Sequence, residues 1–101
     1  MENAAEDITP LPTLIEFYAD WCVPCKSFSS IIESVQKRLS GWMNVLRIDV
    51  DKDKESTEEY GVQTVPSIIF LDRNGELVWR FAGVLSETEI IRKADEIIRF
   101  Y

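Results

Sequence analysis

The sequence contains no histidine and only two cysteines, Cys22 and Cys25. A closed structural zinc site needs four ligands, usually cysteine and histidine, so one copy of this chain cannot complete a site from these residue types. A zinc or iron–sulfur centre shared between two chains stays open at this point. For the single chain we expect neither a metal nor a cofactor.

Basic residues are also few, with 11 Lys and Arg against 18 Asp and Glu and a net charge of -7. Nucleic acids bind through clustered cations, and anionic membrane surfaces attract the same side chains. The composition therefore argues against nucleic-acid and membrane partners.

Long apolar runs are missing too, because no stretch approaches the ~20 residues of a membrane-spanning helix. Residues 1–9 are acidic and lack the basic start and apolar stretch of a signal peptide. We expect a cytoplasmic protein, with a secreted protein whose signal has been removed as the alternative.

What remains is typical of a small globular domain, with 46% hydrophobic and 29% charged residues. Residues 1–12 read as a polar lead-in, and residues 13–101 as one α/β domain. The patterns predict strands at residues 13–19, 43–50, 67–71 and 76–82. A first helix should follow the turn at residues 20–25 and run to Leu39, residues 51–60 should form a charged connection that contains a short helix, and a closing helix should begin after Ser86. Crossovers through helices make the first strands parallel, so we expect a mixed sheet.

Short motifs mark the element ends. Asn74-Gly75 favours a tight primed turn that joins the last two strands antiparallel. Ser86 and Glu89 have the spacing of a capping box at the start of the closing helix. Its buried side should consist of Ile90, Ile91, Ala94, Ile97 and Ile98.

The two cysteines lie where the first strand ends and the first helix begins. A disulfide between cysteines this close in sequence would stabilise the fold by only about 2 kcal/mol. The pair is therefore better suited to a redox-active disulfide than to a structural one. The helix N-terminus favours a thiolate at Cys22, the attacking species in disulfide exchange. Cys25, one turn later and less exposed, is placed to resolve the mixed disulfide.

Residues 19–26, Ala-Asp-Trp-Cys-Val-Pro-Cys-Lys, resemble the active-site segment of the thioredoxin family. Further matches in family order are found at residues 47–51, 62–66, 74–75 and 82–84. The resemblance implies a thioredoxin-like fold, a central mixed sheet flanked by helices. It also implies a protein-disulfide reductase recharged by a thioredoxin reductase or another thiol donor.

The same resemblance implies roles for residues around the cysteines. The Val65–Pro66 bond would be cis and would place the Val65 backbone beside Cys22, where an extended client segment pairs with it. The client groove would be lined by Tyr18, Trp21, Val50, Thr64, Ala82, Gly83 and Val84. Glu16 replaces the family's buried Asp and would assist proton transfer at Cys25 with a raised pKa, near Arg47. The alternative for Glu16 is a half-exposed strand face.

Three departures from the family pattern matter. Val23 stands where glycine is usual, so Val23 and Pro24 should tune reduction potential and rate. Ser30 replaces a proline, so the helix kink should be absent. The usual first strand and helix have no room before Thr13, which exposes the edge strand at residues 43–50. Residues 1–11 or a second subunit would cover it, so we expect a monomer with an edge-mediated dimer as the alternative.

The same residues are compatible with other functions. A reductase or oxidase for a few partners outside the cytoplasm, and a redox-inert interaction module, are the alternatives to a general reductase. Asp49, Asp51 and Asp53 alternate as in a calcium loop, but Lys54 and Tyr60 occupy positions where such loops need Gly and Glu. We therefore expect a solvated turn there.

Overall fold

Four strands and three helices follow one another as β1-α1-β2-α2-β3-β4-α3 along residues 10–101, the part of the chain that this computed structural model describes. The strands are β1 (Thr13–Tyr18), β2 (Asn44–Asp49), β3 (Ser67–Leu71) and β4 (Leu77–Ala82). The helices are α1 (Val23–Arg38), α2 (Lys54–Glu59) and α3 (Glu87–Phe100). The α/β order expected from the sequence is confirmed.

The strands form one mixed sheet in the order β2-β1-β3-β4. β1 lies parallel to β2 and antiparallel to β3, and β4 pairs antiparallel with β3. The four middle residues of β1 are buried, as expected for an apolar strand covered on both faces. The strand that leads to the cysteines is therefore fixed in the centre of the fold.

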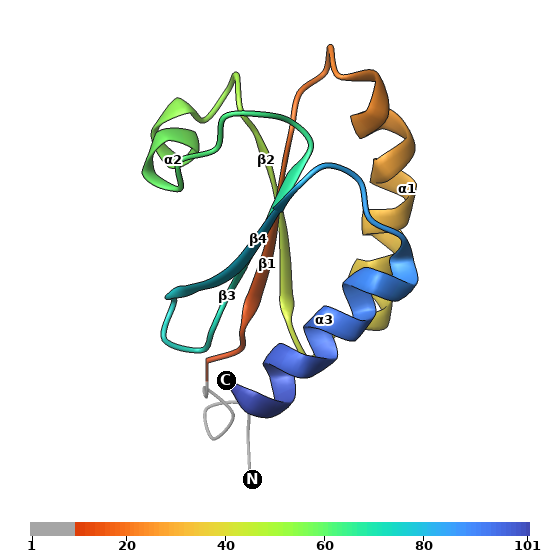
Figure 1. Cartoon of the computed structure of the whole chain (residues 1–101), viewed down its shortest axis with the longest axis vertical. Helices are drawn as coiled ribbons and strands as arrows, with labels where there is room; N and C mark the ends of the chain where they lie inside the picture. Colours follow the sequence, from red (N-terminus) through yellow and green to blue (C-terminus); the bar gives the residue numbers. More distant parts are fainter. Residues whose placement is uncertain (1–9) are drawn as a thin grey trace, which may run out of the picture.

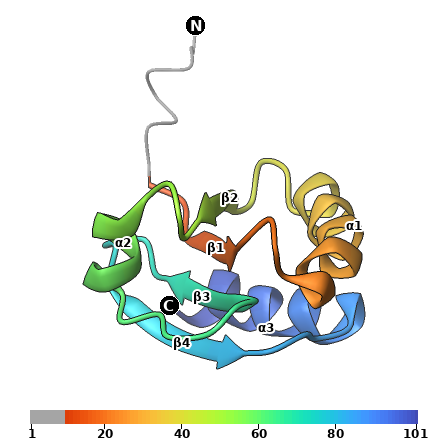
Figure 2. The ribbon, with the colours of Figure 1, turned by 90° about the horizontal axis from the view of Figure 1, so that it is seen from above.

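Helices α1 and α3 cover one face of the sheet, and α2 lies against the other (Figure 1; Figure 2 gives the view from above). The larger core lies beneath α1 and α3 and includes Leu14, Phe28, Ile32, Val35, Ile68, Phe70, Ile90, Ala94 and Ile97. The smaller one, on the side of α2, includes Ile15, Phe17, Ile69 and Leu71, with Tyr60 and Val62 against it. Side chains alternate between faces along a strand, so β1 contributes to both.

The predicted primed turn between β3 and β4 is wrong, although the antiparallel hairpin itself is confirmed. A type I′ turn needs positive φ at both central residues, and among the described residues only glycines have positive φ. The Gly75 N–H donates to the Asp72 carbonyl at 2.9 Å, and Gly75 has φ of 84°. The Asp72 carboxylate accepts the N–H groups of Asn74 and Glu76 at 2.8 and 3.0 Å. These three hydrogen bonds stabilise a right-handed turn, which is followed by Gly75 in the left-handed conformation.

The ends of the elements carry the expected caps. The Ser86 hydroxyl accepts the Glu89 N–H, and the Glu89 carboxylate accepts the Ser86 N–H, both at 3.1 Å. The capping box at the start of α3 is thus confirmed. α1 runs without interruption through Ser30.

β2 is an edge strand of the described sheet. Ahead of Thr13 the structure describes only residues 10–12, and these form neither strand nor helix. Residues 1–9, most of the expected cover for this edge, lie outside the described residues. Within residues 10–101, no helix is both long enough and apolar enough to cross a bilayer.

Candidate active site

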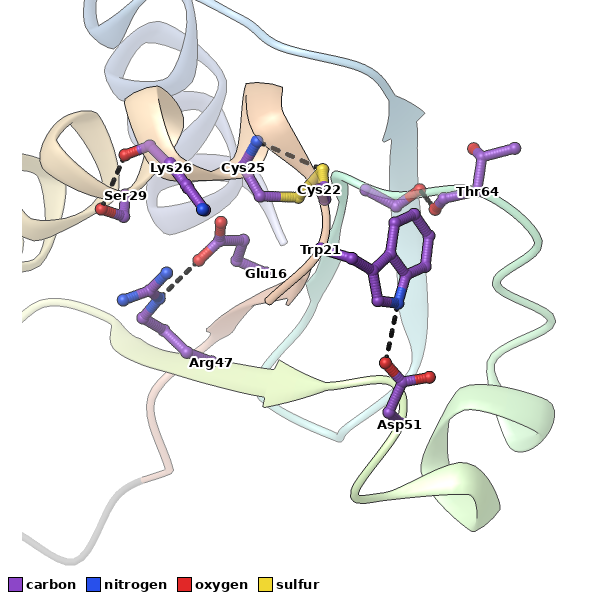
Figure 3. Close-up of a disulfide and its surroundings, with 10 residues drawn as sticks. Glu16, Trp21, Cys22, Cys25, Lys26, Ser29, Arg47, Asp51 and Thr64 are labelled. Carbon is purple, nitrogen blue, oxygen red and sulfur yellow. Dashed lines mark hydrogen bonds and ion pairs between the residues drawn. A yellow bond between two sulfur atoms is a disulfide. The ribbon is translucent and has the colours of Figure 1, made fainter. Parts of the chain in front are cut away.

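The start of α1 positions the two cysteines. Cys22 is the N-cap residue, in an extended conformation, and its sulfur accepts the Cys25 N–H at 3.2 Å. Pro24 occupies the first turn, where a helix needs no backbone donor. One helical turn brings the two Cα atoms to 5.2 Å, and a disulfide joins the sulfur atoms (Figure 3).

The disulfide is set into the surface. Cys22 is 4% exposed and Cys25 is 3% exposed, so the expected difference in exposure between them is absent. Ala19 packs on the pair, and Tyr18, Val50 and Val65 lie partly buried around it. Only a small part of each cysteine is therefore accessible from solvent.

The Val65–Pro66 peptide bond is cis, as expected. The Pro66 carbonyl accepts the Gly83 N–H at 2.8 Å, which joins the loop before β3 to the end of β4. Gly83 has φ of 127°, a conformation that side chains with a Cβ rarely adopt. The glycine therefore fixes how closely these two loops approach.

Most of the expected groove residues gather near these loops. Trp21, Val50, Thr64 and Val65 line a cavity of about 110 Å³. Thr64 also lines a neighbouring cavity of about 280 Å³ that includes Ala82. Trp21 is 67% exposed, and Val84 is exposed as well. Tyr18, Gly83 and Val84 line neither of these two cavities, and Tyr18 packs against the cysteine pair.

The orientation of Trp21 depends on a contact that the sequence analysis missed. Its indole Nε1–H donates to the Asp51 carboxylate at 2.8 Å. The neighbouring acids have separate local partners: Asp49 accepts the Asp51 N–H, and Asp53 accepts the Ser56 N–H at the start of α2. The expectation of a solvated turn is wrong for Asp49, which is buried.

Glu16 is fully buried, which rules out the half-exposed alternative. It lies on the same face of β1 as Leu14, beneath the start of α1, and its register partner on β2 is Arg47. Arg47 Nε donates to Glu16 Oε1 at 2.6 Å, and Oε2 has no hydrogen-bond partner among the described residues. Burial raises the pKa of Glu16, and the hydrogen bond and charge of Arg47 oppose that rise.

A third cavity reaches the disulfide from the side of β2. It has a volume of about 170 Å³, and its lining includes Tyr18, Asp20, Cys25, Lys26 and Arg47. The Arg47 guanidinium carbon lies 4.6 Å from the centre of the Tyr18 ring. Cys25 therefore lies between an apolar groove on one side and a charged cavity on the other.

Val23 completes the surface beside the disulfide. It is 73% exposed and is the first residue of α1. Its branched side chain faces solvent and does not contribute to the core.

Comparisons with known proteins agree with this geometry. The thioredoxin family model matches residues 3–96. A thioredoxin of Rickettsia conorii is 41% identical over 66 residues, and the alignment covers 65% of this chain and 62% of the relative. Thioredoxin-1 of Drosophila melanogaster is 44% identical over 70 residues, covering 69% of this chain and 64% of the relative. The aligned part of the chain thus spans less than two thirds of these relatives.

Solved structures give a longer match. The crystal structure of Deadhead, a germline-specific thioredoxin of Drosophila melanogaster, superposes with a TM-score of 0.80 and 34% sequence identity. That superposition covers 92% of this chain and 87% of the other.

Proposed function

The chain belongs to the thioredoxin family, and we propose that it reduces protein disulfides by dithiol–disulfide exchange through Cys22 and Cys25. One observation carries the proposal. The Cys22 sulfur lies at the N-terminus of α1 and accepts a backbone N–H of its first turn. Donors and a helix dipole directed at a sulfur favour its thiolate, the nucleophile in exchange.

The reaction takes two exchanges. The Cys22 thiolate attacks one sulfur of a client disulfide, and the other client sulfur leaves as a thiolate that takes up a proton. Cys25 then loses its proton and attacks the Cys22 sulfur, which forms the Cys22–Cys25 disulfide and releases the second client thiol. Two electrons pass from the protein to the client.

We assign client binding to the residues around the apolar groove. Trp21, Thr64, Val65, Pro66, Gly83 and Val84 form this group. The Val65 backbone would pair with an extended client segment as one strand pairs with another, and the exposed Trp21 face would cover it. Val23 and Pro24, beside the attacking sulfur, would tune the rate and the reduction potential.

Glu16 is the proposed proton acceptor for Cys25. It is buried under the start of α1, and its free oxygen, Oε2, has no competing partner among residues 10–101. A carboxyl whose pKa is raised by burial accepts a proton more readily near neutral pH than an exposed one. This would lower the barrier to forming the attacking Cys25 thiolate.

The proposed partners follow from the direction of the exchange. An oxidised Cys22–Cys25 pair needs a thiol donor, such as a thioredoxin reductase, before the next turnover. The cytoplasm keeps thiols reduced, so we propose that the protein works there. Both cysteines, Pro66 and Glu16 come from one chain, which supports a monomer as the active unit.

The test is turnover of an insulin-like disulfide substrate with a dithiol as electron donor. The wild-type protein should accelerate reduction, and Cys22→Ser should abolish the acceleration while the circular dichroism spectrum stays unchanged. Cys25→Ser should instead accumulate clients as mixed disulfides at Cys22. A wild-type chain without turnover would favour the inert interaction module, and net oxidation of dithiols would favour an oxidase.

A further inference from the structure

Tyr18 lies beside the cysteine pair, and its ring faces Arg47 (4.6 Å from the guanidinium carbon to the ring centre). We infer that Tyr18 is a positioning residue whose ring holds the Arg47 guanidinium on one oxygen of Glu16. The other oxygen is thereby left free on the side of Cys25. This role rests on the proposed function and replaces the client contact expected for Tyr18.

The geometry orders the three side chains. β1 places Glu16 and Tyr18 on one face, two residues apart, and the parallel register puts Arg47 opposite Glu16 on β2. The guanidinium can then stack on the ring while its Nε donates to Glu16 Oε1 at 2.6 Å. A stacked guanidinium at a partly exposed site is held by about 0.5–2 kcal/mol.

The stacking of Arg47 on Tyr18 while Arg47 binds Glu16, called the clamp below, has a consequence for the second oxygen of Glu16. The Arg47 side chain is 31% exposed, so without the ring it would have free space in which to turn toward solvent. Figure 3 shows Glu16 between Arg47 and the start of α1, with its second oxygen turned away from the guanidinium. With Arg47 fixed on Oε1, Oε2 is the oxygen left to take a proton from Cys25.

Few other charges face Glu16. Lys26 on α1 and Asp20 before it line the same cavity as Arg47 and Cys25. Asp49 on β2 is occupied by the Asp51 N–H, and the register partner on β3, Ile68, carries no charge. Arg47 forms the ion pair that the described residues give Glu16. After burial, its hydrogen bond and charge therefore have the largest effect on the pKa of this carboxyl.

The pKa of Glu16 is the direct readout. It is measured in the oxidised protein, without turnover, by the infrared band of the protonated carboxyl, with Glu16→Gln to assign the band. Tyr18→Leu removes the ring, and Tyr18→Phe is the matched control that keeps it. Tyr18→Leu should raise the pKa of Glu16 because burial persists while Arg47 is released. Tyr18→Phe should leave it unchanged.

A double-mutant cycle separates the clamp from a general packing defect. Arg47→Met should raise the pKa of Glu16 at least as far as Tyr18→Leu, and adding Tyr18→Leu to Arg47→Met should raise it no further. Tyr18→Met, which fills the space with a flexible apolar chain, repeats the test should Tyr18→Leu fail to fold. An unchanged pKa in the ringless variants, or an equal rise in Tyr18→Phe, overturns the clamp.

Kinetics then connect the clamp with the proposed reaction. The pH profile for resolution of the mixed disulfide should move upward in Tyr18→Leu by as much as the pKa of Glu16. Each unit lowers the rate about tenfold at a pH below that pKa. A shifted pKa with an unshifted profile contradicts the proton step of the proposed function but leaves the clamp standing. An unshifted pKa in a protein that reduces clients contradicts the clamp alone.

Discussion

Replacing Glu16 with Gln should change how the stability of the fold depends on pH. Glu16 is fully buried, and burial raises its pKa above the ordinary value of 4.5 even though Arg47 opposes the rise. Between the unfolded and folded pKa values, the native protein therefore binds more protons at this carboxyl than the unfolded chain does. Stability from this group is fully present below the unfolded pKa and is lost as pH rises through the folded pKa.

The magnitude follows from a single proton. The slope can reach about 1.4 kcal/mol per pH unit within that window and falls to zero above the folded pKa. Gln cannot titrate, so the free energy of unfolding of Glu16→Gln should rise relative to wild type across the window. The amide oxygen can still accept from Arg47 Nε as the protonated carboxyl does, and the cost of exchanging one neutral acceptor for the other, at most about 1 kcal/mol, is the same at every pH. That cost shifts the free energy of unfolding of Glu16→Gln relative to wild type by a constant amount and leaves its dependence on pH unchanged.

Urea unfolding of the oxidised proteins from about pH 4 to about pH 8 measures the difference. Glu87→Gln is the matched control, because hydrogen bonds from Ser34 and Arg38 lower the pKa of Glu87. Its stabilising effect is present above the unfolded pKa and is lost as pH falls, so its pH dependence has the opposite sign. A Glu16→Gln difference that stays constant across the range, or that follows the sign of Glu87→Gln, refutes the raised pKa.

Three further changes test other parts of the site and fold. Val23→Gly should alter the reduction potential or the rate of reduction by a thioredoxin reductase. It should lower the free energy of unfolding by no more than about 1 kcal/mol. A reduction potential and rate identical to those of the wild type would mean that Val23 does not tune the redox reaction. Asp51→Ala should move the indole N–H resonance of Trp21 and weaken client binding, because the acceptor 2.8 Å from Nε1 is lost; an unmoved resonance contradicts this. Ser86→Ala should cost about 1 kcal/mol in chemical unfolding through loss of the helix cap, and no change would mean that water replaces it.

Most of the fold could be predicted from patterns of residues that lie close together in the sequence. The apolar run of β1, the helical spacing of α1 and the capping box of α3 each depend on residues close in sequence, and each was confirmed. The turn after β3 was mispredicted because the Asp72 side chain, rather than the Asn74-Gly75 pair, determines its backbone. A dipeptide preference is small and is overridden by the two backbone N–H groups that donate to the Asp72 carboxylate.

The site was predictable only in part. The cysteine spacing and the position of Glu16 on a buried strand could be deduced from the sequence. The contact between Trp21 and Asp51 joins residues 30 positions apart, and the stacking of Arg47 on Tyr18 depends on the register between β1 and β2. Register arises from how a crossover helix packs, which no local pattern encodes.

The bond from the Gly83 N–H to the Pro66 carbonyl also determines which way β4 presents its backbone. Pairs alternate along an antiparallel ladder, so the N–H and C=O groups of Arg80 and Ala82 point away from β3. β4 ends the described sheet on that side, and Arg80 is its only charged residue. An edge strand with free N–H and C=O groups can pair with a strand of another chain, and a charged residue on it opposes this pairing. On β4 that residue is Arg80. Exchanging Arg80 for an apolar residue is therefore expected to reduce solubility at high concentration well before it reduces the stability of the fold.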